Sequence, residues 1–161
     1  MKNIVLIGMM GAGKTTLAKE LSLILGRDMI DMDEYIETKY NMSIPEMFDA
    51  SEEYFRERET ICALEVSKKE NVIISTGGGI IKNPQNMEAL SENGIIIYID
   101  RPIDNIMEDI NVIHRPLLKD GPEKLRILYK ERHETYKHYA HYHLVNDKTI
   151  QDIIDKILEV R

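Results

Sequence analysis

Residues 8–16, with the sequence GMMGAGKTT, combine the residue types that bind phosphate groups. They fit the pattern G-x-x-x-x-G-K-[ST] and lie between an apolar run at 4–7 and a segment with helical periodicity. Glycines let the backbone turn several N–H groups toward phosphate oxygens, and the next helix adds its positive N-terminal end. Lys14 is expected to reach the β- and γ-phosphates, and the Thr15 hydroxyl to ligate the accompanying Mg²⁺. The pattern therefore predicts a nucleotide phosphate site.

Two acids follow the short apolar pair at 29–30. Asp31 and Asp33 are one residue apart, so their side chains can point the same way from an extended segment. One carboxylate could help to hold Mg²⁺, and the other could accept a hydrogen bond from a substrate hydroxyl. The alternative is that Asp33 only caps a helix that begins at Glu34.

Three consecutive glycines, Gly77, Gly78 and Gly79, follow the apolar run at 72–74. Glycines at the end of a strand carry a cost in conformational entropy, and they let a ligand approach backbone N–H donors without obstruction. The alternative is a flexible turn before the Asn83-Pro84 pair.

Arginines supply positive charge for an anionic substrate. Arg56 and Glu59 are three residues apart on a predicted helix and share a face, so Glu59 can hold Arg56 for a bidentate contact with a carboxylate. Arg132 and Tyr136 share a face of a later helix. Arg115 lies in a segment with little periodicity, from which it could reach a transferred phosphoryl group. For each arginine, the alternative is a solvated surface charge.

The elements that must position these residues alternate between strand and helix, which predicts a parallel sheet covered on both faces. The expected strands lie at 3–7, 29–30, 72–74, 95–99 and 142–145. The expected helices lie at 14–25, 33–41, 51–69, 84–92, 102–110, 123–141 and 149–160. Ser51 is expected to cap a helix, and Asn83-Pro84 and Arg101-Pro102 to place proline at a first helical position.

Composition narrows the class of protein. The 161 residues suit a single domain, and the net charge of −7 argues against a general nucleic-acid binder. The one cysteine, Cys62, excludes an internal disulfide, suits a reducing cytoplasm and is expected to be buried packing. The sequence shows neither a membrane-spanning run nor a signal peptide, so we expect no membrane partner.

Taken in order, these motifs resemble the shikimate kinase family along nearly the whole chain. The matching elements are GMMGAGKTT, the DMD acids, FRERE, STGGG, RPLL and RHETY. The resemblance implies a three-layer α/β/α fold of the P-loop kinase type, with five parallel strands in the order 2-3-1-4-5. It also implies one domain over 1–161, substrate-binding helices at about 33–60 and a lid at about 111–122. The protein is expected to be a monomer.

The resemblance implies an enzyme that transfers the γ-phosphoryl group of ATP to shikimate, with Mg²⁺ as cofactor. Arg56 and Arg132 would hold the shikimate carboxylate, and Asp33 would bind ring hydroxyls and act in catalysis. The glycines that would contact the same substrate are Gly77, Gly78 and Gly79.

On the nucleotide side, Lys14 and Arg115 would flank the γ-phosphate as catalytic residues. Thr15 would bind Mg²⁺ directly, and Asp31 would bind it through water. The remaining residues implied in nucleotide binding are Gly11, Ala12, Gly13 and Thr16.

Some residues depart from the family pattern. Ala18 stands where the family usually has glycine. Residues 107–113 carry no arginine where members commonly have one near adenine, and 146–148 match the adenine loop poorly, so a different adenine contact is expected. Two other functions remain open: a related kinase of another small polyol acid, such as gluconate, and a non-catalytic nucleotide switch.

Overall fold

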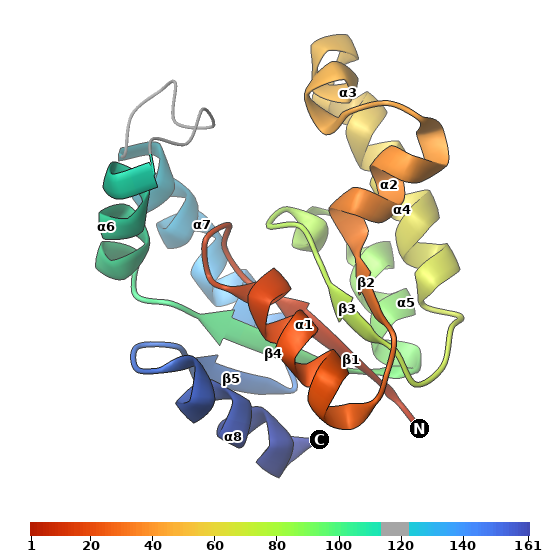
Figure 1. The fold of residues 1–161 in the computed structure, drawn as a ribbon. Helices are drawn as coiled ribbons and strands as arrows, with labels where there is room; N and C mark the ends of the chain where they lie inside the picture. The colour runs from red at the N-terminus through yellow and green to blue at the C-terminus, as the bar shows by residue number, and fades with distance from the viewer. Residues whose placement is uncertain (114–122) are drawn as a thin grey trace.

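The described residues of the computed structural model, 1–113 and 123–161, contain one five-stranded sheet (Figure 1). All of its neighbouring strands run parallel, in the order β2-β3-β1-β4-β5. The strands are β1 (Asn3–Ile7), β2 (Met29–Asp31), β3 (Ile73–Ser75), β4 (Gly94–Asp100) and β5 (Tyr142–Val145). The predicted strands and their order are confirmed.

Helices cover both faces of this sheet and give three layers, as predicted (Figure 1). They are α1 (Lys14–Leu25), α2 (Met32–Tyr40), α3 (Ile44–Ala50), α4 (Glu52–Val66), α5 (Pro84–Glu92), α6 (Ile103–Ile113), α7 (Glu123–Tyr139) and α8 (Ile150–Val160), with a short 3₁₀ helix η1 (Ile80–Lys82). Within the described ranges, none of these helices combines the length and apolar character needed to cross a bilayer.

Alternation along the strands builds two apolar cores. In β1, Ile4 and Leu6 face a core shared with α1 and α8, whereas Val5 and Ile7 face a core shared with α4, α5 and α7. Cys62 lies in the second core, fully buried as expected, and burial raises the pKa of its thiol to about 11. The sheet is therefore held from both sides.

Strand register brings the predicted motifs to one edge of the sheet. Leu6 of β1 pairs with Ser75 of β3, and Ser75 pairs with Asp31 of β2. The Thr76 hydroxyl donates to the Leu6 carbonyl at 2.8 Å and fixes the two strand ends together. The phosphate-loop, acidic and glycine motifs therefore leave neighbouring strands at the same carboxyl-end edge, where parallel sheets bind ligands.

The helix boundaries largely follow the predicted caps. The Ser51 hydroxyl accepts a hydrogen bond from the Tyr54 N–H at 2.9 Å, and Asn83 caps α5 with Pro84 at its start. The prediction for Pro102 was wrong by one residue, because α6 begins at Ile103.

Helix α3 was not predicted from the sequence. This helix starts with a reciprocal capping box, in which the Ser43 hydroxyl accepts from the Glu46 N–H and the Glu46 carboxylate accepts from the Ser43 N–H. Pro45 in the first turn favours the same start. Cap residues alone therefore mark a seven-residue helix that is too short for periodicity to reveal.

Candidate active site

The loop between β1 and α1 has a backbone that requires glycine. Gly8 has φ 146°, and an added Cβ would lie 2.5 Å from the Ile99 carbonyl oxygen of β4. Gly11 and Gly13 also have positive φ, at 80° and 95°. These conformations wrap the chain over the N-terminus of α1, where backbone N–H groups favour an anion.

Lys14 begins α1 and is only 7% exposed. Its ammonium donates hydrogen bonds to the Gly8 carbonyl and, at 3.0 Å, to the Met9 carbonyl. Burial lowers the pKa of Lys14 to about 8, although the nearby Asp33 carboxylate opposes this shift. A buried ammonium held mainly by carbonyl oxygens is well suited to receive an anionic ligand.

Oxygen donors gather beside Lys14. The Thr15 hydroxyl donates to Asp31 Oδ2 at 3.3 Å and lies 3.4 Å from the Ser75 hydroxyl. The other Asp31 oxygen, Oδ1, caps α2 by accepting from the N–H groups of Asp33 and Glu34. The alternative that Asp33 is the cap was therefore wrong, and Asp31 takes that role. A hydroxyl and a carboxylate at this spacing fit the oxygen chemistry that Mg²⁺ prefers.

Asp33 lies near the phosphate loop rather than in a cap. Burial raises the pKa of its carboxyl group, the Asp31 carboxylate raises it further, and the Lys14 ammonium opposes the change. Gly77 leaves space for this side chain, because an added Cβ would lie 2.9 Å from Asp33 Oδ1. Asp33 also lines a cavity of about 300 Å³ together with residues 9–16 and 76–78.

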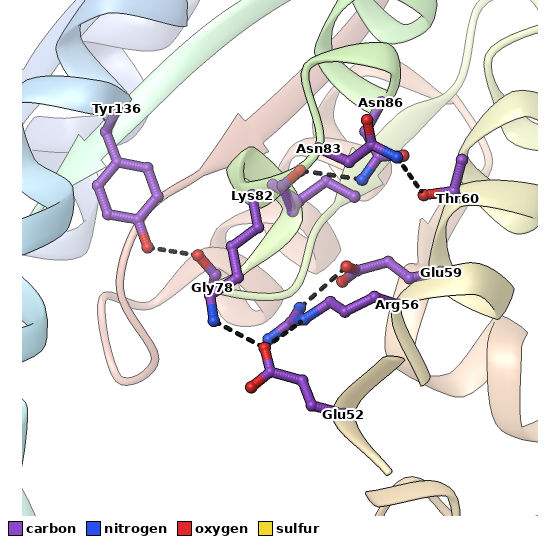
Figure 2. Close-up of polar contacts among 10 residues, drawn as sticks. Glu52, Arg56, Glu59, Thr60, Gly78, Lys82, Asn83, Asn86 and Tyr136 are labelled. Carbon is purple, nitrogen blue, oxygen red and sulfur yellow. Dashed lines mark hydrogen bonds and ion pairs between the residues drawn. The ribbon is translucent and has the colours of Figure 1, made fainter. Parts of the chain in front are cut away.

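Arg56 on α4 is held by two carboxylates (Figure 2). Its Nη1 donates to Glu59 Oε1 at 2.9 Å, and its Nε donates to Glu52 Oε2 at 3.2 Å. The Lys82 ammonium binds the same Glu52 oxygen at 2.7 Å, so Glu52 joins η1 to α4. The guanidinium lies against Gly79, where an added Cβ would be 2.4 Å from Nη1.

Glu59 is the buried member of this group, at 2% exposure. Burial raises the pKa of Glu59, and the Arg56 guanidinium opposes the shift. Glu52 is about half exposed, and hydrogen bonds from Lys82 and Arg56 lower its pKa despite some desolvation. Arg56 therefore has one fixed partner inside the protein and one partner at the surface.

Arg132 and Tyr136 approach the same glycine segment from α7. The Tyr136 hydroxyl donates to the Gly78 carbonyl at 2.6 Å (Figure 2). An added Cβ on Gly78 would lie 3.3 Å from Arg132 Nη1. Gly77, Gly78 and Gly79 therefore face Asp33, Arg132 and Arg56 in turn, and each glycine makes room for one charged side chain.

A second cavity, of about 270 Å³, lies on the other side of the phosphate loop. Its lining residues are Ala12, Gly13, Thr16, Leu17, Arg101, Asn105, Asn146, Asp147, Lys148 and Ile150. Ala12, Gly13 and Thr16 also line the first cavity. The N-terminus of α1 therefore borders both spaces.

A polar cluster centred on Asp100 joins α7 to the sheet. The Tyr129 hydroxyl donates to Asp100 Oδ1 at 2.8 Å, and His143 Nε2 lies 2.7 Å from Asp100 Oδ2. The Tyr98 hydroxyl lies 2.8 Å from His133 Nδ1. These contacts join α7 and β5 to the carboxyl end of β4.

The structure brings most of the predicted site residues together. Lys14, Thr15, Asp31, Asp33, Arg56, Arg132 and the three glycines surround one edge of the sheet. The predicted lid is only partly described, because 111–113 end α6 whereas 114–122, including Arg115, lie outside the described residues.

Two further groups near this edge were not predicted from the sequence. The first is the pair of Lys82 and Glu52, whose contact joins segments 30 residues apart. The second is Arg101, which follows β4 directly and donates to the Gly11 carbonyl at 3.0 Å. Its place just after a predicted strand was the available signal, since residues at the carboxyl ends of parallel strands often face ligands.

Comparisons with known proteins agree with this geometry. Residues 10–161 match a family model described as shikimate kinase. A shikimate kinase from Clostridium botulinum (strain Alaska E43 / Type E3) is 46% identical, over 99% of this chain and 98% of the relative.

Solved structures show the same similarity. The shikimate kinase from Acinetobacter baumannii in complex with shikimate matches with a TM-score of 0.91 and 36% identity, over 99% of this chain and 92% of that chain. The shikimate kinase from Aquifex aeolicus vf5 matches with a TM-score of 0.84 and 33% identity, over 98% of this chain and 94% of that chain. The likeness therefore extends over nearly the full length of each protein.

Proposed function

The chain belongs to the shikimate kinase family, and on this premise we propose how its residues share the reaction. The enzyme transfers the γ-phosphoryl group of ATP to the 3-hydroxyl of shikimate and gives shikimate 3-phosphate and ADP, a step toward chorismate and the aromatic amino acids. The assignment of roles rests on one observation above all. The glycine segment 77–79 meets an aspartate and two arginines beside the phosphate loop.

On the acceptor side, Arg56 and Arg132 hold the shikimate carboxylate. Two guanidinium groups suit a carboxylate because each presents N–H donors in a planar fork. Asp33 accepts hydrogen bonds from the ring hydroxyls next to the attacking oxygen. Gly78 and Gly79 let the ring approach the backbone, and they leave room for the guanidinium groups of Arg132 and Arg56.

On the donor side, the loop glycines and the N-terminus of α1 bind the ATP phosphates. Lys14 reaches the β- and γ-phosphates in place of the carbonyls that it now contacts. Thr15 and Asp31 would hold Mg²⁺, since their oxygens lie 3.3 Å apart and are of the type that this cation prefers. The cation, when bound, neutralises charge on the phosphates.

Phosphoryl transfer requires mainly that the protein align the two reacting groups and neutralise the charge on the phosphates. Asp33 orients the attacking hydroxyl and accepts its proton, which its raised pKa favours. Lys14 stabilises the charge that develops on the transferred group. The role proposed for Arg115 at the γ-phosphate rests on the resemblance of the sequence to the family alone.

We also propose that the enzyme acts as a monomer in the cytoplasm. The described candidate residues all come from one chain, so the site that they form needs no second copy. A single buried thiol, that of Cys62, is compatible with a reducing compartment.

A coupled assay of ADP release tests the acceptor. We expect turnover with shikimate and a kcat/KM at least about 100-fold lower with gluconate, because hydrogen-bonding sites discriminate strongly against poorly matched acceptors. Nucleoside monophosphates are assayed as a third class of acceptor. Equal turnover with gluconate would favour the related polyol-acid kinase, and nucleotide binding without turnover of any acceptor would favour a switch.

Changing Gly79 to alanine tests the position of Arg56. The new Cβ would lie within 2.4–2.7 Å of the guanidinium, so Arg56 must move from its place beside Glu59. We expect the KM for shikimate to rise about 10-fold, on the scale of one weakened charged hydrogen bond, with little change in the KM for ATP.

Steady-state kinetics with Gly26→Ala provides the control for this change. Gly26 has φ 63°, unlike Gly79 at −94°, so alanine there strains the backbone, but its Cβ meets nothing within 4 Å. The variant therefore controls for a general loss of stability that does not touch Arg56. An unchanged KM for shikimate in Gly79→Ala would contradict the assignment of Arg56 to the substrate carboxylate.

A further inference from the structure

Arg56 is held in its place by several contacts besides the one with Glu52. Its Nη1 donates to Oε1 of the buried Glu59 at 2.9 Å, and both Nη atoms lie close to Gly79, where an added Cβ would collide with them. The guanidinium carbon also lies over the Phe55 ring, 5.1 Å from its centre. The position of the guanidinium therefore does not depend on Glu52.

Glu52 occupies an edge of this guanidinium that a substrate carboxylate can use. A carboxylate binds a guanidinium through two parallel N–H bonds, either from Nη1 and Nη2 or from Nε and Nη2. Glu59 and Gly79 lie at the first pair of nitrogens, whereas Glu52 Oε2 accepts from Nε of the second pair at 3.2 Å (Figure 2). Glu52 and the carboxylate of shikimate would therefore compete for one edge, a step that rests on the proposed role of Arg56.

Glu52 is the partner of Arg56 that can leave. Its side chain is 51% exposed, and the same Oε2 accepts from the Lys82 ammonium at the shorter distance of 2.7 Å (Figure 2). The hydrogen bond from Lys82 lowers the pKa of Glu52 more than the hydrogen bond from Arg56 does. Lys82 is itself about half exposed on η1, so it can keep Glu52 when Arg56 releases it.

The ion pair of Lys82 and Glu52 is not the only link between η1 and α4. The side-chain amide of Asn83, the residue after η1, donates to the Thr60 hydroxyl of α4 at 3.1 Å (Figure 2). An exposed ion pair adds little to stability by itself. The use of Lys82 and Glu52 is therefore to be sought in the site that they border.

We propose that Glu52 is an internal competitor for Arg56, which the carboxylate of shikimate displaces, and that Lys82 holds Glu52 after this exchange. Glu52 then lowers the affinity of the site for its substrate, and Lys82 raises that affinity by reducing the cost of the exchange. The competing explanation is that Glu52 positions Arg56, as Glu59 does. The two explanations predict changes of opposite sign when Glu52 is replaced.

Calorimetric titration of the full chain with shikimate measures this competition. For Glu52→Gln we expect the Kd for shikimate to fall about three-fold, on the scale of one exposed ion pair, because an uncharged amide competes less well for Arg56. For Lys82→Met we expect a rise of about three-fold, since Glu52 then has Arg56 as its remaining partner. Titration with ADP and Mg²⁺ should give the wild-type Kd for both variants.

Glu53→Gln is the matched control. Glu53 lies beside Glu52 in the first turn of α4, so its replacement changes the net charge and the charge at the helix N-terminus in the same way. Among the residues that the structure describes, Arg56 pairs with Glu52 and Glu59 and not with Glu53. We expect a Kd for shikimate close to that of the wild type. A gain equal to that of Glu52→Gln would assign the effect to net charge and overturn the proposal.

The double variant tests how Lys82 acts. When Glu52 is already glutamine, Lys82→Met should leave the Kd for shikimate nearly unaltered, because Lys82 acts through Glu52. An undiminished loss in that background would show that Lys82 contacts the substrate itself, and would overturn its role as the partner of Glu52. A higher or unchanged Kd in Glu52→Gln alone would overturn the competition.

Failure of the proposed function has a different signature. If Arg56 binds the substrate carboxylate, Arg56→Gln should raise the Kd for shikimate at least about 10-fold, on the scale of a hydrogen bond to a charged group. An unchanged Kd in Arg56→Gln would contradict the role of Arg56. A loss of affinity there, together with no gain in Glu52→Gln, would overturn the competition and leave the role of Arg56 in place.

Discussion

Replacing Lys14 with methionine is expected to lower kcat by about 100- to 1,000-fold, the usual cost of removing one group that stabilises charge in a transition state. Lys14 is the buried cation of the phosphate loop. The carboxylates of Asp33 and Asp31 are close enough to favour its charged form. Methionine has a similar length and keeps the apolar contacts of the stem. Steady-state kinetics with saturating shikimate and ATP provides the measurement.

The low pKa of Lys14 adds a pH dependence to nucleotide binding. With a pKa of about 8, roughly half of the free enzyme carries a neutral amine at pH 8. A bound polyphosphate favours the ammonium and so raises this pKa. Binding of ADP should therefore take up protons near pH 8, and its Kd should rise as the pH increases above that value. Calorimetry in buffers of different ionisation enthalpy measures this uptake.

Lys19→Met is the matched control, because Lys19 lies five residues further along α1 and is exposed. It should leave kcat and proton uptake close to those of the wild type. Near-normal kcat in Lys14→Met would show that the loop backbone and the cation neutralise the phosphates without this side chain.

Changing Asp33 to asparagine is the second large effect that we expect. The amide keeps the size of the side chain but cannot accept a proton, so kcat should fall about 100-fold or more, within the range of general-base catalysis. The KM for shikimate should rise as well, because the hydroxyls lose a charged acceptor. Separate measurement of kcat and KM shows which role dominates.

The same variant is expected to be more stable than the wild type at neutral pH. Because burial raises the pKa of Asp33 in the folded state, ionising this carboxyl group costs folding free energy. This cost is absent below the unfolded pKa and develops as the pH rises through the folded value. Asp33→Asn should therefore raise the Tm at pH 7, and the gain should shrink as the pH falls toward about 4.

Glu34→Gln is the control for both measurements, since Glu34 neighbours Asp33 on α2 but is exposed. A normal kcat with a raised KM in Asp33→Asn would assign Asp33 to binding alone. A lower Tm at neutral pH would show that the carboxylate contributes contacts that outweigh its desolvation.

The positions of the strands and most helices could be predicted because local signals agree with the tertiary structure, whereas the strand order came from the family resemblance. The apolar runs of β1 and β4 are long enough to identify buried strands, and Ser51 and Asn83 mark helix starts by their side-chain oxygens. Helix α3 was missed because seven residues are too few to show helical periodicity, and only its capping box marks where it begins. Asp31, rather than Asp33, caps α2. Which of the two does so depends on the backbone turn between them, and their spacing in the sequence does not determine that turn.

Residues with a defined motif were easier to place than residues that act through tertiary contacts. Lys14, Arg56 and Arg132 belong to recognisable patterns, and their side chains lie at the same edge of the sheet. Lys82 and Arg101 belong to no pattern, and their roles arise from contacts with Glu52 and with the Gly11 carbonyl on other segments. Such partners become visible only when the fold has brought the segments together.

Strand β3 has a consequence for the order in which the site can form. The phosphate loop lies between β1 and α1, which are consecutive in the chain, but its Gly11 and Ala12 carbonyls accept hydrogen bonds from Arg101 and Asn146, which are 90 and 134 residues away. The glycine segment reaches its place only when Thr76 meets the Leu6 carbonyl, across a separation of 70 residues. Closing so long a loop costs chain entropy that local contacts do not repay, and such pairings slow folding. Both halves of the site therefore depend on long-range closure, and a chain still emerging from the ribosome can complete neither the glycine segment before β3 nor the phosphate loop before Asn146 has been made.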